Sequence, residues 1–259
     1  MLLDEASSVR FCHSGWVLLR GALTEEQREI LRIWVDEAES HKADHWLRYH
    51  EVSAGGTKVL SRIENFIEPS SSIAFLVQPL SPLIGIVSAL FQDEAVLFKD
   101  KINLKPPGGG AYTVHQDAPA YRGFGITDFI TAMVAVDDAT VANGCLEFAV
   151  GPRITRELEL DRDGQIVASQ LEQIDFQPVP VQAGDAIVFD GLVPHRSAPN
   201  HSGLPRRAVF LTFNPRKQGD KRTEYYQAKR RLFPPENQRQ ADLDYHNVGR
   251  QFNLGNPFV

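Results

Sequence analysis

The sequence is poor in cysteine, with only Cys12 and Cys145 among its 259 residues. Two cysteines cannot build a disulfide framework, so we expect a reducing, cytoplasmic compartment. No apolar run reaches the roughly 18 residues that a membrane-spanning helix needs, and no membrane span is expected. The first residues, Met1 to Glu5, lack basic positions ahead of an apolar stretch. A secretory signal peptide is therefore not expected either.

Positive charge is also scarce. The chain has 27 Lys and Arg against 33 Asp and Glu, a net charge of −6, and a pI near 5.8. Nucleic-acid binders normally carry a basic balance, so we expect a small-molecule partner and no nucleic acid. Repeats and low-complexity tracts are absent from the sequence. The length fits one large β-rich domain and leaves monomer and homodimer open.

The N-terminal third shows mainly helical signals. Residues 15–19 (GWVLL) predict a short buried strand. Residues 24–27 (TEEQ) form a capping box that opens an amphipathic helix. Residues 81–82 (SP) place a serine N-cap before a proline, and they start an apolar helix that runs through residue 91. We therefore predict a helical N-terminal layer over about residues 1–94.

Beyond residue 94 the pattern changes to short strands divided by Gly, Pro and Asn turns. Strands are predicted at residues 95–104, 129–136, 145–150, 179–181, 186–189 and 206–213. This pattern predicts an all-β core with flanking helices (α+β), a sandwich or barrel over about residues 95–215. Residues 216–259 are predicted to form a C-terminal tail or lid. Its basic stretch, residues 216–231, is either a solvated face or a lid that attracts an anionic substrate.

The motif His115-Gln116-Asp117 can carry metal chemistry. On an extended strand, residues two apart point to the same face. The histidine and the carboxylate are then the local half of a two-His-one-carboxylate iron site, which needs a second histidine. By itself such a motif is more often a surface turn. His195, which lies 78 residues after Asp117 at the end of a predicted strand, can supply the missing ligand in a jelly roll.

The segment after His195 adds candidate anion-binding groups. His195 and Ser197 share a face by alternation. The turn at residues 199–203 then sends the chain back, so Arg206 or Arg207 lies opposite them. An arginine there can bind a carboxylate through two charge-assisted hydrogen bonds. Alternation alone does not choose between the two arginines.

Four motifs in order resemble the phytanoyl-CoA dioxygenase family. They are HxD at 115–117, NGCLE at 143–147, AGD at 183–185, and HxS at 195–197 with Arg206 eleven residues after the histidine. Members of this family are non-haem Fe(II), 2-oxoglutarate-dependent oxygenases on a double-stranded β-helix, a cupin-like jelly roll. The resemblance spans about residues 10–215. It implies a single catalytic domain with His115, Asp117 and His195 as catalytic iron ligands. It also implies that Arg206 binds the distal carboxylate of 2-oxoglutarate beside Ser197, and that Arg207 is structural.

The strand at residues 95–104 is expected to line the cosubstrate pocket. Alternation places Phe98 and Ile102 on its apolar face, and Lys101 and Asn103 on its polar face. In ectoine hydroxylases of this family an asparagine at the place of Asn103 touches the cosubstrate. Lys101 either joins it as a cosubstrate contact or belongs to a solvated edge. Where phytanoyl-CoA hydroxylases have a tryptophan, this chain has Met133.

The resemblance also bears on the reaction and its substrate. Related halogenases replace the carboxylate with a small residue, so Asp117 implies hydroxylation. The segments SRIENF (61–66), KIN (101–103) and QDAPAY (116–121) are similar to bacterial hydroxylases of 2-aminoethylphosphonate-type compounds. The expected substrate contacts are Arg62, Asn65, Tyr112 and Tyr121, with structural roles as the alternative. A pocket with both arginine and glutamate suits a small zwitterion.

Three other interpretations remain open. One is a hydroxylase of a natural-product, amino-acid or acyl-CoA substrate with the same site. Another is a non-catalytic cupin-like binding protein, which would have lost a ligand or the anchoring arginine. The last is a zinc hydrolase that uses the same three ligands.

Overall fold

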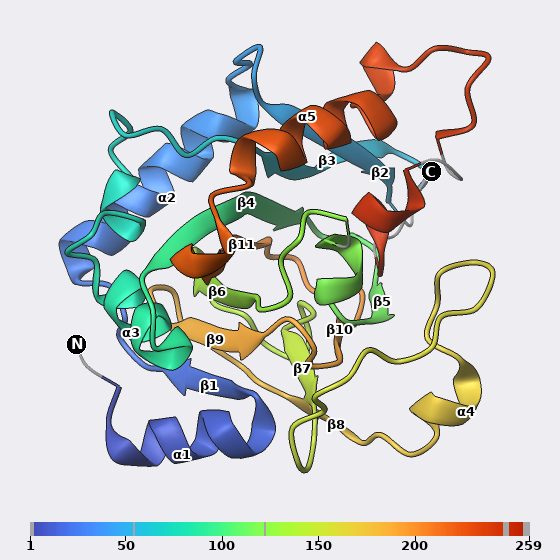
Figure 1. Ribbon diagram of the computed structural model, residues 1–259. Coiled ribbons are helices and arrows are strands. Elements are labelled where there is room, and N and C mark those ends of the chain that lie inside the picture. Colours follow the sequence, from blue (N-terminus) through green and yellow to red (C-terminus); the bar gives the residue numbers. More distant parts are fainter. Residues whose placement is uncertain (1–2, 54, 122, 246–248, 256–259) are drawn as a thin grey trace.

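The computed structural model describes residues 3–53, 55–121, 123–245 and 249–255. Within them, two antiparallel sheets face each other (Figure 1). The larger sheet contains, in spatial order, β1 (Trp16–Leu19), β9 (Ala186–Asp190), β6 (Ile130–Ala135), β11 (Arg206–Pro215), β4 (Ala95–Lys105), β3 (Lys58–Glu64) and β2 (Leu47–Val52). The smaller contains β5 (Tyr112–His115), β10 (His195–Ser197), β7 (Leu146–Ala149) and β8 (Phe176–Pro178). Spatial neighbours that are distant in the chain make this a jelly roll, as predicted.

The helices are α1 (Glu5–Ser14), α2 (Glu25–Ser40), α3 (Pro82–Phe91), α4 (Ala168–Leu171) and α5 (Arg222–Leu232). α2 and α3, with Phe11 of α1, pack on the outer face of the larger sheet (Figure 1). α5 packs in a separate cluster with Phe98 and Tyr121. Short 3-10 turns are η1 (Ala74–Leu76), η2 (Ala118–Tyr121), η3 (Arg216–Gln218), η4 (Glu236–Gln238) and η5 (Arg250–Asn253). The predicted capping box opens α2, with both Thr24–Gln27 hydrogen bonds formed. Ser81 precedes Pro82 as predicted, but its hydroxyl donates to the Leu76 carbonyl instead of capping α3.

The N-terminal third is not purely helical, which corrects our prediction for residues 1–94. β1 confirms the strand predicted at residues 15–19. β2 and β3 were not predicted, and all three strands extend the larger sheet. In β2, Leu47, Tyr49 and Glu51 are buried in alternation. The buried glutamate hides this period-2 pattern in the sequence, because a carboxylate reads as a solvent-facing residue.

A β-bulge in β4 corrects the predicted facing of Phe98. β11 pairs Thr212 with Lys99 and Phe213 with Leu97, so Phe98 has no partner in that register. The extra residue turns Phe98 away from the helix-covered face that holds Ile102. It packs instead with Tyr121 and Tyr225. Alternation from the sequence cannot locate such a bulge.

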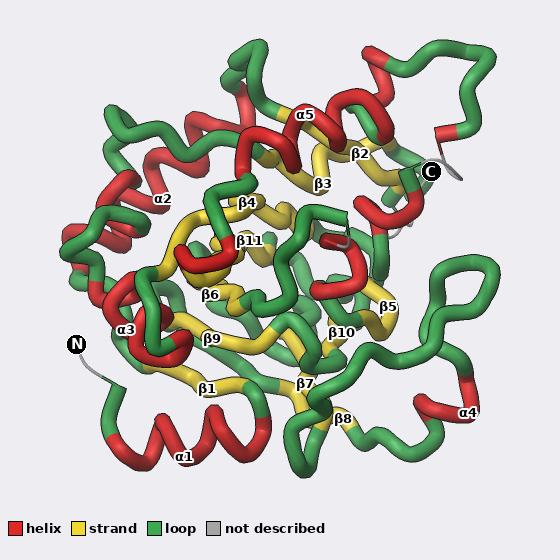
Figure 2. The backbone as a smooth tube through the Cα atoms, in the orientation of Figure 1, coloured by secondary structure: helices red, strands yellow, loops and turns green. Residues whose placement is uncertain are grey.

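The segments around β8 differ slightly from expectation. The strand predicted at 179–181 lies at Phe176–Pro178, and Val181 forms only an isolated bridge with Ala139. Residues 150–167, between β7 and α4, form a long loop outside the sheets (Figure 2). No helix in the described ranges is long and apolar enough to cross a membrane.

The tail is anchored by ion pairs. Arg222 of α5 pairs with Asp100 of β4, and the Lys229 ammonium lies 2.6 Å from the Glu64 carboxylate of β3. Arg216 pairs with Glu94 at 2.5 Å. All three of these residues of the basic stretch 216–231 are therefore paired with carboxylates, and Lys229 is also fully buried, whereas Arg216 is exposed.

Candidate metal centre and cosubstrate pocket

The two predicted histidine ligands are brought together by strand pairing. His115 ends β5, and it is the register partner of His195, the first residue of β10. Asp117 follows just beyond β5, and its Oδ1 lies 3.8 Å from His115 Nε2. One ligand atom from each of the three residues lies within 4.8 Å of the other two, and all three side chains are buried. In the described part of the chain, this is the one group of three such side chains that is close enough to hold a metal ion.

Backbone carbonyls orient both imidazoles. His115 Nδ1 lies 2.8 Å from the Thr113 carbonyl oxygen, and His195 Nδ1 lies 3.0 Å from that of Val193. A carbonyl only accepts, so Nδ1 carries the proton in each ring. The Nε2 lone pairs are then left for a metal ion, as in most histidine-ligated sites.

The electrostatics favour ligand-competent protonation states. Burial, followed by the charge of His195, lowers the pKa of His115 to about 3. Burial alone would raise the pKa of Asp117, but the charges of His195 and Lys101 lower it to about 2. Neutral imidazoles and an ionised carboxylate are the forms that bind a metal. They are the forms present at neutral pH.

A basic pocket lies beside Ser197, two residues after His195 on β10. Arg206 begins β11, and its Nη2 lies 3.4 Å from Ser197 Oγ. Lys105 is the register partner of Arg206, and its Nζ donates to Ser197 Oγ at 2.8 Å and to the Ala198 carbonyl at 2.5 Å. Burial, followed by the charge of Arg206, lowers the pKa of Lys105 to about 6. An anion bound between Arg206 and Lys105 would pair with the guanidinium and favour the charged form of the lysine.

An unpaired buried donor fits this pocket to 2-oxoglutarate. Arg206 Nε is buried and has no acceptor among the described residues. A carboxylate held by Arg206, Ser197 and Lys105 would supply the missing acceptor. The donor set of the triad likewise fits Fe(II). Sequence reasoning missed Lys105, although it continues the alternation of Lys101 and Asn103.

Arg207 lies on the opposite face of β11. Its guanidinium bonds to Asp137, Asp36 and Glu39. Met133, at the place of the family tryptophan, is buried between the sheets as a register partner of Phe210.

The predicted substrate contacts separate into three locations. Arg62 is buried, with Nε 3.1 Å from Glu64 Oε1 and its guanidinium carbon 4.4 Å from the Tyr49 ring centroid. Tyr112 lies beside the cosubstrate pocket, with its ring centroid 5.1 Å from Lys105 Nζ. Tyr121 lies in η2, directly after Asp117, with its ring centroid 5.5 Å from Lys99 Nζ.

The structure does not bring Asn65 to the triad. Its side chain donates to the His45 carbonyl and accepts from Arg222, so it helps to anchor α5. Its φ of +61° marks the sharp turn that ends β3. The expectation of a substrate contact there is not supported, because the turn directs the side chain away from the sheet interior.

Glu64 sits at the centre of a buried charge cluster that sequence reasoning found only in part. Its carboxylate oxygens lie 2.6 Å from Lys229 Nζ and 4.0 Å from Lys99 Nζ. Burial would raise the pKa of Glu64, but the charges of Lys229, Lys99 and Arg62 lower it to about 2. Glu64 is therefore already paired and is not available for a substrate ammonium. Lys229 and Glu64 are 165 residues apart in the sequence, so only the fold reveals that they form a pair.

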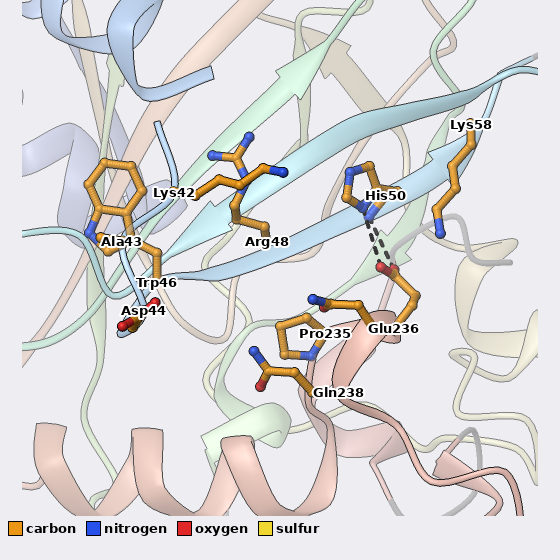
Figure 3. Close-up of a pocket in the computed structure, with 11 residues that line it drawn as sticks. Lys42, Ala43, Asp44, Trp46, Arg48, His50, Lys58, Pro235, Glu236 and Gln238 are labelled. Carbon is orange, nitrogen blue, oxygen red and sulfur yellow. Dashed lines mark hydrogen bonds and ion pairs between the residues drawn. The ribbon is translucent and has the colours of Figure 1, made fainter. Parts of the chain in front are cut away.

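A surface cavity of about 570 Å³ lies elsewhere (Figure 3). Lys42, Arg48, His50, Lys58 and Glu236 are among the residues that line it. His50 Nδ1 lies 3.3 Å from Glu236 Oε2, an ion-pair contact between β2 and η4. No triad residue lines this cavity, so cavity size does not locate the reaction site.

Comparison with known proteins agrees with this geometry. The phytanoyl-CoA dioxygenase (PhyH) family model matches residues 11–208. A 2-aminoethylphosphonate dioxygenase from uncultured bacterium HF130_AEPn_1 is 40% identical over 248 residues, 94% of each chain. A methylphosphonate hydroxylase from Gimesia maris is 38% identical over 233 residues, 89% of this chain and 88% of that protein.

Solved structures share the fold. EctD from S. alaskensis, crystallised with 2-oxoglutarate and 5-hydroxyectoine, has a TM-score of 0.70 at 18% identity, over 83% of this chain and 77% of its own. The epimerase SnoN, in complex with Fe3+, alpha ketoglutarate and nogalamycin RO, has a TM-score of 0.67 at 18% identity, over 82% and 83%. These structures show the fold alone. Family membership and reaction class rest on the family match and on the two relatives named above. This chain belongs to the phytanoyl-CoA dioxygenase (PhyH) family, and it is an Fe(II)- and 2-oxoglutarate-dependent oxygenase.

Proposed function

We propose that the protein hydroxylates a C–H bond of a small organophosphonate of the 2-aminoethylphosphonate type. The observation that carries the reaction class is the buried triad beside Arg206, whose Nε lacks an acceptor. The substrate class is supported by the names of the two relatives that cover about nine tenths of the chain. The balanced reaction converts substrate, 2-oxoglutarate and O2 into hydroxylated substrate, succinate and CO2.

Different side chains bind the metal and the cosubstrate in this proposal. Bound iron would supply the oxidising chemistry of the reaction. His115, Asp117 and His195 would hold it through two imidazoles and one carboxylate. Arg206, Ser197 and Lys105 bind the distal carboxylate of 2-oxoglutarate, and Asn103 orients it. Asp117 keeps the position that a halide would need, so the outcome is hydroxylation.

Apolar neighbours limit the entry of water. Phe148 stacks on the His195 ring at a centroid distance of 5.8 Å, and Phe189 packs against it in a tilted arrangement at 4.9 Å. Dry walls strengthen the charge interactions in the site and suppress uncoupled turnover.

The alternatives have weaker support. A non-catalytic module has no need of three intact ligands and the arginine, and all four are buried here. A zinc hydrolase leaves Arg206 and Lys105 without an anion. A hydroxylase of natural products, amino acids or acyl-CoA esters uses the same triad, so the substrate decides between it and our proposal.

A substrate panel tests the proposal. The Fe(II)-loaded protein is incubated with 2-oxoglutarate and O2, and succinate release is measured with 2-aminoethylphosphonate, methylphosphonate, betaines, amino acids and acyl-CoA esters. We expect the phosphonates to stimulate release and Asp117→Ala to abolish it. Stimulation by another class alone would keep the reaction and reject the substrate. Turnover unchanged in Asp117→Ala would reject the reaction as well.

We also propose that the whole chain acts as one catalytic domain in the cytoplasm. Support for one domain comes from β1, β2 and β3, which complete the sheet that carries Arg206. Support for the compartment comes from Cys12 and Cys145, which are both free thiols.

A further inference from the structure

Three polar side chains around the inner face of β4 have hydrogens to donate and no acceptor. Among the described residues, Lys101 Nζ has no hydrogen-bond or ion-pair partner, and it lies 4.8 Å from the Phe210 ring centroid. Lys99 Nζ lies 4.0 Å from Glu64, beyond hydrogen-bond distance. The Tyr225 hydroxyl is buried and unpaired. Lys99 and Tyr225 are buried, and Lys101 is half-buried. Buried donors normally find acceptors, so the group is incomplete as it stands.

The neighbouring carboxylate cannot complete it. Glu64 is already held by Lys229 at 2.6 Å and by Arg62 at 3.1 Å. Three cationic side chains thus lie within 4.0 Å of one carboxylate, and Lys101 lies on the next strand as the register partner of Glu64. Burial, followed by the charge of Lys99, lowers the pKa of Lys101 to about 7, and the charges of Asp117 and Glu64 oppose this shift without cancelling it.

The group faces the metal centre and is separate from the cosubstrate pocket. Thr212, the register partner of Lys99, has its hydroxyl oxygen 3.0 Å from that of Thr131, and Thr131 Oγ1 lies 3.5 Å from Asp117 Oδ2. Lys99 Nζ also lies 5.5 Å from the ring centroid of Tyr121, in the turn that follows Asp117. Lys105, the register partner of Arg206, is four residues after Lys101 on β4. At the rise of a strand, that spacing is about 13 Å. Lys99 and Lys101 therefore lie apart from the cosubstrate pocket, and Lys99 lies on the part of β4 that is linked to Asp117.

We propose that Lys99, Lys101 and Tyr225 form an oxyanion subsite that binds the phosphonate group of the substrate. The inference rests on the proposed function and refines it, because it assigns Lys101 to the substrate and not to 2-oxoglutarate. A phosphonate has three acceptor oxygens and up to two negative charges, which matches three donors and two ammonium groups. A carboxylate offers only two oxygens, and a sulfonate only one charge. A site with buried donors rejects ligands that leave them unpaired.

The test compares three acids on one backbone: 2-aminoethylphosphonate, taurine and β-alanine. We measure kcat and KM for each with wild type, Lys101→Met, Lys99→Met and Tyr225→Phe, together with KM for 2-oxoglutarate. Calorimetric titration of 2-aminoethylphosphonate under nitrogen reports binding without turnover. Lys58→Met, an exposed lysine on the neighbouring strand β3, is the matched control. Lys101→Arg keeps the charge.

A charge-assisted hydrogen bond lost from a buried site weakens binding by about 10- to 100-fold. We expect an increase of that size in KM and Kd for 2-aminoethylphosphonate in Lys101→Met and Lys99→Met, with a smaller one in Tyr225→Phe. KM for 2-oxoglutarate should change less than about threefold, Lys101→Arg should recover most of the affinity, and Lys58→Met should match wild type.

Two results would overturn the inference in different ways. If wild type hydroxylates 2-aminoethylphosphonate and both lysine variants bind it with unchanged Kd, the subsite is wrong and the proposed function stands. If wild type turns over no phosphonate, the proposed function fails, and the subsite fails with it. Circular dichroism confirms the fold of each variant. Tyr225→Phe, which loses one hydroxyl, still tests the subsite if a lysine variant unfolds.

Discussion

His115 and His195 are direct register partners on β5 and β10, and their ring centroids lie 4.2 Å apart. This pairing converts the local His115–Asp117 motif into a metal site. We predict that His195→Ala lowers Fe(II) affinity by more than about 100-fold, beyond the loss typical of an outer-shell change. Equilibrium dialysis of ferrous iron measures it.

His50→Ala is the control for the iron measurement, because His50 pairs with Glu236 at the surface cavity. It should bind iron like wild type. Retention of full iron affinity by His195→Ala would remove His195 from the ligand set.

Arg206 and Arg207, which lie on opposite faces of β11, give a second prediction. Arg206→Ala should raise KM for 2-oxoglutarate by about 10- to 100-fold, because a charged hydrogen-bond partner of the carboxylate is lost. Arg207→Ala breaks ion pairs with Asp137, Asp36 and Glu39. It should lower the free energy of unfolding by about 1–3 kcal/mol and leave that KM within about twofold. Steady-state kinetics and urea unfolding check the pair, and equal effects on KM would contradict the assignment.

The comparison of these arginines shows what sequence can and cannot predict. Alternation placed Ser197 with one of them, and the family spacing selected Arg206, which lies 3.4 Å from Ser197 Oγ. The triad and the jelly roll followed from ordered motifs in the same way. Lys105 was missed because a lysine at a strand end reads as a solvated residue.

Contacts between distant residues and local irregularities of the strands could not be predicted from the sequence. The Glu64–Lys229 pair joins β3 to α5, and no local pattern couples residues so distant. The bulge at Phe98 reverses the facing expected from strict alternation. Asn65, an expected substrate contact, lies one residue past β3 in a left-handed conformation that the sequence does not reveal.

The buried Glu64–Lys229 pair gives a third prediction. Glu64→Gln leaves Lys229, Arg62 and Lys99 without their carboxylate, and it should lower the free energy of unfolding by about 3–5 kcal/mol. In the double variant Glu64→Gln with Lys229→Met, one uncompensated cation is removed. Its destabilisation should be smaller than the sum of the two single changes. Urea unfolding of all four proteins measures this coupling, and strict additivity would show that the pair does not interact.

Acid unfolding supplies a fourth prediction. The pKa of Glu64 is lowered from 4.5 to about 2 in the folded protein. The folded state then releases this proton more readily than the unfolded chain, so its stabilisation is complete above about pH 4.5 and is lost as the pH falls toward 2. The free energy of unfolding should fall less steeply between pH 4.5 and 2 in Glu64→Gln than in wild type. Parallel curves over that range would contradict the lowered pKa.

Gly255 gives the last prediction, because the C-terminal segment passes directly over a metal ligand. The Thr113 amide donates to the Gly255 carbonyl at 2.8 Å, and the Thr113 carbonyl in turn holds His115 Nδ1. A Cβ on Gly255 would lie 2.2 Å from His115 Nδ1, at a φ of +74°. Gly255→Ala must therefore displace either the imidazole or the segment that covers it. Both disturb the orientation of a metal ligand, and we expect Fe(II) affinity to fall by about 10-fold.

Gly56→Ala separates backbone strain from this contact. Gly56 has a similar φ of +78°, but a Cβ there meets nothing within 4 Å. It should lose about 1 kcal/mol of stability through the left-handed conformation and keep its iron affinity. Dialysis with ferrous iron and thermal unfolding of both variants distinguish the effects. If Gly255→Ala binds iron as tightly as Gly56→Ala, the C-terminal segment does not position His115, and the β5–β10 pairing alone holds that imidazole in place.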